Sequence, residues 1–372
     1  MERRAFVRAG LAAGLTGFST SATAITIDPV VARRSGPLRL NSNENALGLA
    51  PAARRAVIDG ITEANRYPRS ATGPLAEALA ARHGVTPDHI VFGNGSTEII
   101  RIAVSAVAGP RARIVLADPT FEDVFRYAEP FGYTLERVPL TSDYAHDIAA
   151  MRQRAYALDG PVLAYICNPN NPTGTLTDCT AIDDWIGSAP ENVVFVIDEA
   201  YFEYVHSDRY WSSVHWVREK SNVIVVRTFS KIFALAGMRV GYGIAHPETT
   251  AKLRAYVTRN TPNHLAGVAA LASLEDEAMI PRSLAANQRG RGILTDALDD
   301  LGIGRLPSQT NFLMHRVGGD LETYIERMRE QDISVGRPFP PMLGYNRVSI
   351  GLPDEMERFV SVLRTFHERG WV

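Results

Sequence analysis

Short apolar runs alternate with longer stretches of helical character between residues 51 and 247. The runs carry no polar alternation, which is typical of strands buried on both faces of a sheet. Strands of this kind, separated by helical lengths, favour parallel pairing. The pattern therefore predicts an α/β fold with a mostly parallel sheet, whose strands are expected at residues 90–92, 113–117, 162–166, 193–197, 223–227 and 239–244, with helices at 98–108 and 121–130.

A different pattern follows Pro247, where helical stretches come first and two apolar runs appear later. This order predicts a smaller α+β domain, with helices at 249–257, 283–301 and 321–331 and strands at 310–316 and 346–350. The Asn, Gly and Pro content of residues 38–51 favours an irregular arm, so we expect the ordered fold to begin near Pro51. We divide the chain into a leader (1–24), an arm (25–50), a large domain (51–247) and a small domain (248–372).

Composition and charge narrow the class of protein. A chain of 372 residues with 45% hydrophobic and 22% charged residues is globular and longer than one core usually grows. A formal net charge of −2 gives no reason to expect nucleic acid or an anionic membrane as partner, so a small-molecule substrate is expected. Cys167 and Cys179 lack the spacing of a zinc site, and we predict two structural thiols and no metal site.

The first 24 residues have the features of a twin-arginine signal peptide. Arg3 and Arg4 precede a mildly apolar run at residues 9–18, and Ala22-Thr23-Ala24 is a small-residue cleavage site. The run is shorter than the ~20 residues that span a bilayer, so we expect no stable membrane anchoring. The leader predicts export to the periplasm. If it is instead an arm with chance arginines, the protein is cytoplasmic.

Lys231 lies in the segment TFSKIFALAGMR at residues 228–239, directly after an apolar run. A residue just past a strand end lies where open α/β sheets bind ligands. A lysine amine there can form an imine with an aldehyde if its pKa is lowered. Ser230 and Arg239 could both reach a phosphate. Lys231 taken alone would be an ordinary surface lysine, and only the surrounding motif favours the chemical role.

Asp198 ends the apolar run of the segment VVFVIDEAY at residues 193–201. A carboxylate at the mouth of a buried strand is costly without a cationic partner. A protonated pyridine nitrogen is one such partner, and the pairing would keep that ring an electron sink. The alternatives are a helix N-cap or a salt bridge to an arginine.

Two further segments follow predicted strands. CNPNNPTG at residues 167–174 is a rigid turn by composition, in which Asn171 could donate a hydrogen bond to a phenolic oxygen. GNGSTE at residues 93–98 joins a strand to a helix, whose free N–H groups could bind a phosphate. Many helices begin with Ser or Thr as a simple cap, so the second signal is weak alone.

These four segments, with NSNENALG (41–48), NRYP (65–68) and RVSIG (347–351), resemble the fold-type I pyridoxal-phosphate aminotransferases, in particular the histidinol-phosphate aminotransferase-like branch. The resemblance covers nearly all of the chain after the leader. It implies a Schiff base between Lys231 and pyridoxal 5'-phosphate and ping-pong transfer of an amino group between an amino acid and a 2-oxo acid. The other implied cofactor ligands are Gly95, Ser96, Thr97, Asn171, Asp198, Tyr201, Ser230 and Arg239.

The resemblance also implies contacts beyond one cofactor. Tyr67 matches a tyrosine that reaches the phosphate of the neighbouring subunit, so a homodimer is expected. Arg347 matches the arginine that holds the substrate α-carboxylate, and Arg337 is a second candidate anion contact. Phe121 departs from the family's usual tyrosine over the cofactor ring, which keeps the stacking and loses a hydrogen bond. A decarboxylase of the same fold and a non-catalytic sensor remain alternatives.

Overall fold

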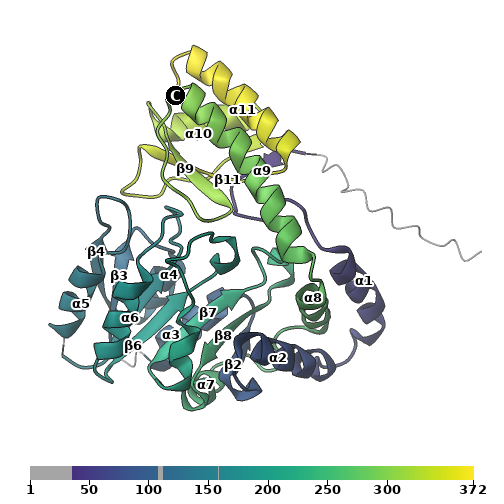
Figure 1. Ribbon diagram of the computed structural model, residues 1–372, viewed down its shortest axis with the longest axis vertical. Helices are drawn as coiled ribbons and strands as arrows, with labels where there is room; N and C mark the ends of the chain where they lie inside the picture. The colour runs from purple at the N-terminus through teal and green to yellow at the C-terminus, as the bar shows by residue number, and fades with distance from the viewer. Residues whose placement is uncertain (1–35, 108–111, 158) are drawn as a thin grey trace, which may run out of the picture. The chain divides into compact units, whose positions relative to one another are not determined.

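A seven-stranded sheet is the centre of the computed structural model, which describes residues 36–107, 112–157 and 159–372 (Figure 1). The leader 1–24 and the first part of the arm lie outside the described residues. The strand order is β2-β8-β7-β6-β5-β3-β4. The strands are β2 (Ile90–Gly93), β3 (Arg113–Asp118), β4 (Thr134–Pro139), β5 (Val162–Cys167), β6 (Val193–Asp198), β7 (Val223–Thr228) and β8 (Gly241–Ala245).

The prediction of a mostly parallel sheet is confirmed. Strands β4, β3, β5, β6 and β7 pair in parallel, and only β8 runs antiparallel to its neighbours β7 and β2. The apolar runs did not predict β4, because two adjacent charged residues, Glu136 and Arg137, interrupt this edge strand and only Val138 is buried. Five neighbouring strands therefore end at the same edge of the sheet.

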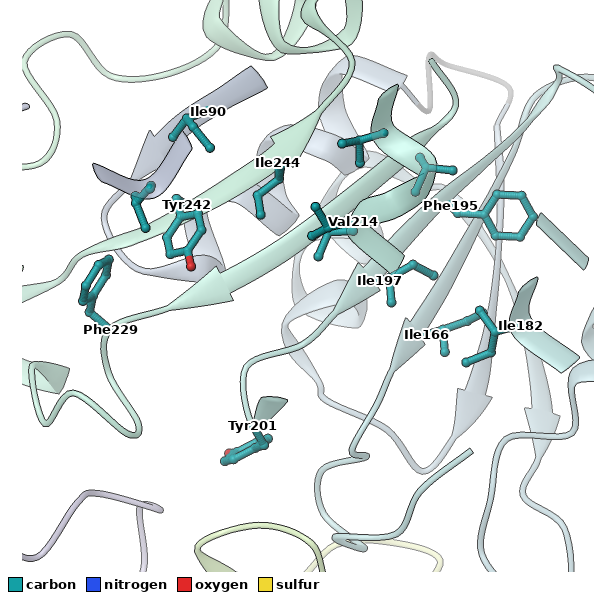
Figure 2. Close-up of a cluster of buried hydrophobic side chains, with 14 of the residues drawn as sticks. Ile90, Ile166, Ile182, Phe195, Ile197, Tyr201, Val214, Phe229, Tyr242 and Ile244 are labelled. Atoms are coloured by element: carbon teal, nitrogen blue, oxygen red, sulfur yellow. The ribbon is translucent and has the colours of Figure 1, made fainter. Parts of the chain in front are cut away.

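Alternate residues of the central strands face two separate hydrophobic cores. In β7, for example, Val223 and Val225 face one core, whereas Ile224 and Val226 face the other. Helices α3 (Ser96–Val107), α4 (Asp123–Ala128) and α7 (Pro247–Arg254) contribute to the second core. The first core, part of which Figure 2 shows, receives α2 (Arg69–His83), α5 (Ile148–Tyr156), α6 (Cys179–Ser188) and α8 (His264–Glu275).

The C-terminal residues have a core of their own. Strands β9 (Phe312–Arg316) and β11 (Tyr345–Ser349) pair antiparallel, and helices α9 (Met279–Asp300), α10 (Leu321–Glu330) and α11 (Pro353–Glu368) contribute to the same cluster. Helix α8 instead packs on α1 (Pro51–Gly60) and α2. No helix was predicted at α8, because its alanine-rich sequence has almost no helical periodicity. The described residues belong to one compact unit, so the division at residue 247 stays a prediction.

The expectation that the ordered fold begins near Pro51 is wrong. Leu38 and Arg39 form a short strand, β1, that pairs in parallel with β10 (Ile333–Ser334). A two-residue strand has no periodicity to detect, and its partner lies far along the chain. Residues 38–40 are thereby held against the C-terminal part of the fold.

Short 3₁₀ helices are found at η1 (Ile61–Glu63), η2 (Pro87–His89), η3 (Glu129–Phe131), η4 (Phe202–Tyr204), η5 (Ser213–Arg218) and η6 (Ala236–Met238). The helix expected at residues 121–130 is therefore two short pieces, α4 and η3. Among the described helices, none has both the length and the apolar character that crossing a bilayer requires.

Candidate active site

Three segments that follow neighbouring parallel strands bring chemical groups to one cavity. Asp198 is the last residue of β6, Lys231 lies three residues after β7, and Asn171 lies four residues after β5. The cavity has about 750 Å³ of empty space, part of it open to solvent. Its lining includes Ser42, Glu44, Ser96, Thr97, Phe121, Cys167, Asn171, Asp198, Tyr201, Thr228, Ser230, Lys231 and Arg239. Nine of the residues predicted to bind the cofactor thus share one cavity.

The Lys231 amine has the contacts and the lowered pKa of a nucleophile. Its Nζ donates to the backbone oxygen of Asn43 at 3.4 Å and lies 5.6 Å from the centre of the Tyr201 ring. Burial and, to a smaller extent, the positive charge of Arg347 lower the pKa of Lys231 to about 8, although the negative charge of Asp198 opposes them. A lysine with this pKa has a neutral fraction near pH 7 that can attack an aldehyde.

The Asp198 carboxylate is buried, and the donors that it has among the described residues are neutral. The hydroxyl of Tyr165 donates to Oδ2 at 2.9 Å, and the backbone N–H of Ala200 donates to Oδ1 at 3.1 Å. Burial raises the pKa of Asp198 to about 6 despite these bonds. A cationic ring nitrogen in the cavity would supply the charge that holds this carboxylate ionised. Neither alternative raised by the sequence, a helix cap or an arginine salt bridge, describes these contacts.

The turn between β2 and α3 forms a cradle for an anion. Gly95 has a φ of 80°, and a Cβ atom there would overlap the guanidinium of Arg239. Ser96 is the first residue of α3, so its N–H is among those that no turn of the helix satisfies. Ser230 and Arg239 line the same cavity as Ser96 and Thr97. Free N–H groups, a hydroxyl and a guanidinium together suit a phosphate.

A second cavity adjoins the first and shares Ser42, Phe121, Asn171 and Lys231 with it. Arg347 lies in this cavity and is buried. Its Nη1 donates to Oδ1 of Asn171 at 2.6 Å, and its Nη2 donates to the backbone oxygen of Asn41 at 3.0 Å. Since Oδ1 of Asn171 accepts this bond, the Nδ2 amide of Asn171 is the group that can donate to a ligand. Arg337 also lines this cavity.

The two tyrosines that the resemblance implied as cofactor ligands, Tyr201 and Tyr67, differ in position. The hydroxyl of Tyr201 accepts a hydrogen bond from Nδ2 of Asn43 at 3.0 Å, which fixes the ring beside Lys231. Tyr67 lines neither cavity and is 76% exposed. Its predicted contact would therefore have to be made with another subunit.

Residues of the arm line both cavities, although no role was predicted for them from the sequence. Ser42, Asn43 and Glu44 line the cavities, and Asn43 has a φ of 54°. The available signal for these residues in the sequence was the resemblance of the segment NSNENALG to the family. Glu122, Asp123, Arg126 and Phe339 in the second cavity were missed because no motif marks them. Among the described residues, no group of three or more His, Cys, Asp or Glu side chains could hold a metal ion.

The chain is similar to known aminotransferases over most of its length. A family model described as aminotransferase class I and II matches residues 35–363. A histidinol-phosphate aminotransferase from Moorella thermoacetica is 37% identical over 88% of this chain and 84% of that protein. An aromatic amino acid aminotransferase from Thermobifida fusca is 37% identical over 89% of this chain and 91% of that protein. The histidinol-phosphate aminotransferase from Sinorhizobium meliloti in complex with pyridoxal-5'-phosphate matches with a TM-score of 0.84 and 26% identity, over 90% of this chain and 92% of that chain.

The groups in the first cavity fit pyridoxal phosphate. The cradle at Gly95 suits the phosphate, the buried carboxylate of Asp198 suits a ring nitrogen, and Lys231 suits the aldehyde. The cradle depends on Gly241 of β8, where a Cβ atom would overlap the backbone nitrogen of Ser96. Both the charged side chains and the backbone of the cavity therefore fit the cofactor.

We expect Gly241→Ala to weaken cofactor binding by about 5- to 150-fold, because adding a methyl group to a packed contact costs about 1–3 kcal/mol. The measurement is the dissociation constant of pyridoxal phosphate for the cofactor-free protein, by absorbance titration. Gly237→Ala is the matched control, because nothing lies within 4 Å of a Cβ at Gly237. Equal dissociation constants for the two variants, with both folded by circular dichroism, would contradict the role of Gly241.

Proposed function

The chain belongs to the aminotransferase class I and II family. From that premise we propose the role of each site residue, the oligomeric state of the protein and its cellular compartment. The protein is a pyridoxal-phosphate-dependent aminotransferase, similar to histidinol-phosphate aminotransferases. It moves an amino group between an amino acid and a 2-oxo acid. Bound pyridoxal phosphate supplies an electron sink that stabilises negative charge at the substrate α-carbon.

The chain's own residues orient the substrate and move one proton. In our proposal the guanidinium of Arg347 binds the α-carboxylate of the donor, for which its planar fork is suited. The Lys231 amine would take the proton from the substrate α-carbon and return it to the aldehyde-derived carbon of the cofactor, on the other side of the substrate nitrogen. Asp198 would hold the proton on the cofactor's ring nitrogen. Asn171 and Tyr201 would donate hydrogen bonds to the phenolic oxygen.

One observation carries this assignment. Lys231 lines both the cavity that fits the cofactor and the adjoining cavity that contains Arg347. A donor whose carboxylate is held by Arg347 would therefore have its α-carbon between the two cavities, beside the lysine amine. General bases act only within hydrogen-bond reach of the proton that they remove, so this position suits the role.

The test is to mix the purified holoenzyme with one amino donor at a time and follow conversion of the cofactor from its aldehyde form to its amine form by absorbance. We expect Lys231→Ala to slow the conversion by about 10²- to 10⁴-fold, the usual contribution of a general base. The exposed Lys252 on α7 provides the control variant Lys252→Ala, which should react like the wild type. The chain has three lysines, Lys220, Lys231 and Lys252, so borohydride reduction and peptide mapping identify the attached one. Attachment at either of the other two, or no donor that reacts, would refute the assignment.

We propose that the protein works as a homodimer in which Tyr67 reaches the cofactor phosphate of the partner subunit. Support comes from the family resemblance of NRYP and from the exposure of Tyr67, with Ile58 and Ile61 exposed in the same segment. Apolar side chains exposed in one segment are typical of an interface.

Co-expression of Tyr67→Ala with Lys231→Ala tests the shared site. Random pairing makes half of the dimers mixed, and each mixed dimer has one intact site, so about a quarter of wild-type activity should return. Activity no greater than that of the two variants measured separately would exclude a contribution of Tyr67 across the interface.

We also propose export to the periplasm by the twin-arginine route, on the strength of Arg3, Arg4 and the cleavage site at residues 22–24. Replacing Arg3 and Arg4 together with lysine should retain the protein in the cytoplasm, because lysine keeps the charge and loses the motif. Cell fractionation measures the outcome. An unchanged periplasmic fraction would reject the route, and a wild-type protein found in the cytoplasm would restore the cytoplasmic alternative.

A further inference from the structure

We propose that Glu122 is a specificity residue, which restricts the amino donor to side chains that carry no second negative charge. The proposal rests on the proposed function, because it concerns the part of the substrate beyond the carboxylate held by Arg347. The favoured donors are amino acids with aromatic or other uncharged apolar side chains.

Glu122 pairs with the cation that could otherwise bind an acidic side chain. It directly precedes α4 and lines the second cavity. Its Oε2 lies 2.5 Å from Nη2 of Arg337 and 3.4 Å from Nη2 of Arg126. Arg337, which the sequence suggested as a second anion contact, thus already has a carboxylate partner within the same cavity.

The remaining charges of the second cavity balance once the reacting groups are set aside. Arg347 is committed to the α-carboxylate and Lys231 to proton transfer. Of the other charged residues in the lining, Arg126 and Arg337 are positive, whereas Glu122 and Asp123 are negative. An anionic side chain would have to displace Glu122 from Arg337 and would then face two carboxylates. Repulsion of this kind is how sites reject a competing substrate.

The apolar surface of the cavity suits an uncharged ring. Phe121 and Phe339 are the two aromatic residues of the described lining. The guanidinium carbon of Arg337 lies 4.1 Å from the centre of the Phe339 ring, and that of Arg347 lies 4.5 Å from it. Phe339 also belongs to a hydrophobic cluster with Leu306, Met314 and Met342, so its ring is fixed from behind. A flat apolar side chain can pack on these surfaces without breaking the ion pair of Glu122.

The kinetic test compares the first half reaction of the holoenzyme with L-phenylalanine, L-glutamate and L-aspartate, each without an acceptor. We expect the wild type to react faster with phenylalanine than with either anionic donor. Glu122→Gln should raise the rate constants for both anionic donors, relative to phenylalanine, by about tenfold, because it removes a like charge and releases Arg337. Glu129→Gln is the control, since this exposed carboxylate pairs with Arg137 outside the cavity and should leave the ratio unchanged.

Two more variants separate specificity from folding. Glu122→Asp keeps the charge and should retain the wild-type preference, and Arg337→Gln added to Glu122→Gln should remove most of the gain. An equilibrium measurement gives the same comparison without turnover, from the dissociation constants of 3-phenylpropionate and glutarate for each holoenzyme. Glu122→Gln should improve glutarate binding relative to 3-phenylpropionate by a similar factor.

The proposal is overturned if Glu122→Gln changes neither ratio by more than twofold, or if Glu129→Gln changes them equally. A wild type that prefers glutamate or aspartate to phenylalanine also overturns it. Failure of the proposed function looks different, because no donor would then react with any variant. The two dissociation constants would still report the effect of Glu122.

Discussion

The desolvation of a lysine and an aspartate at one edge of a sheet is the constraint on which the rest of the site depends. Burial lowers the pKa of Lys231 to about 8 and raises that of Asp198 to about 6, so each group is shifted toward its neutral form. Their mutual attraction opposes both shifts and is the smaller effect. Such a cavity stabilises a ligand that supplies the missing charge to Asp198 and an electrophile to Lys231, which is the chemistry of pyridoxal phosphate.

Holding these two groups requires a rigid sheet beneath them. Directly beside Asp198, the carboxylate of Glu199 pairs with Arg227 of β7 at 2.7 Å, with both side chains buried. The same carboxylate accepts from the backbone N–H of Ser213 and the hydroxyl of Ser212, each at 2.8 Å. A buried ion pair that is satisfied in this way fixes its geometry, because losing one partner leaves an uncompensated charge. Of the two acidic residues at the end of β6, Asp198 thus faces the cavity and Glu199 stabilises the sheet beneath it.

Features that depend on neighbouring residues could be predicted from the sequence, whereas features that depend on the tertiary fold could not. Apolar runs long enough to lack alternation marked β5, β6 and β7, and the residues after each run marked the site, because parallel strands bring their ends together without further information. The antiparallel direction of β8 was not predictable, since it depends on where the chain returns and not on its own residues. Glu122 and Phe339 were missed for a related reason. They come from segments more than 200 residues apart, and only the fold brings them into one cavity.

The bond between Arg347 and Asn171 connects the two halves of the site. Nη1 of Arg347 donates to Oδ1 of Asn171 at 2.6 Å, and the Nδ2 of the same amide is then oriented as a donor. Two of the guanidinium's nitrogens therefore hold protein oxygens, whereas Nε has no hydrogen-bond partner within the described residues. A guanidinium has five N–H groups, so a carboxylate can bind without breaking the bond to Asn171. The residue proposed to bind the substrate thus also fixes the amide proposed to bind the cofactor, which makes the orientation of one ligand depend on the contacts of the other.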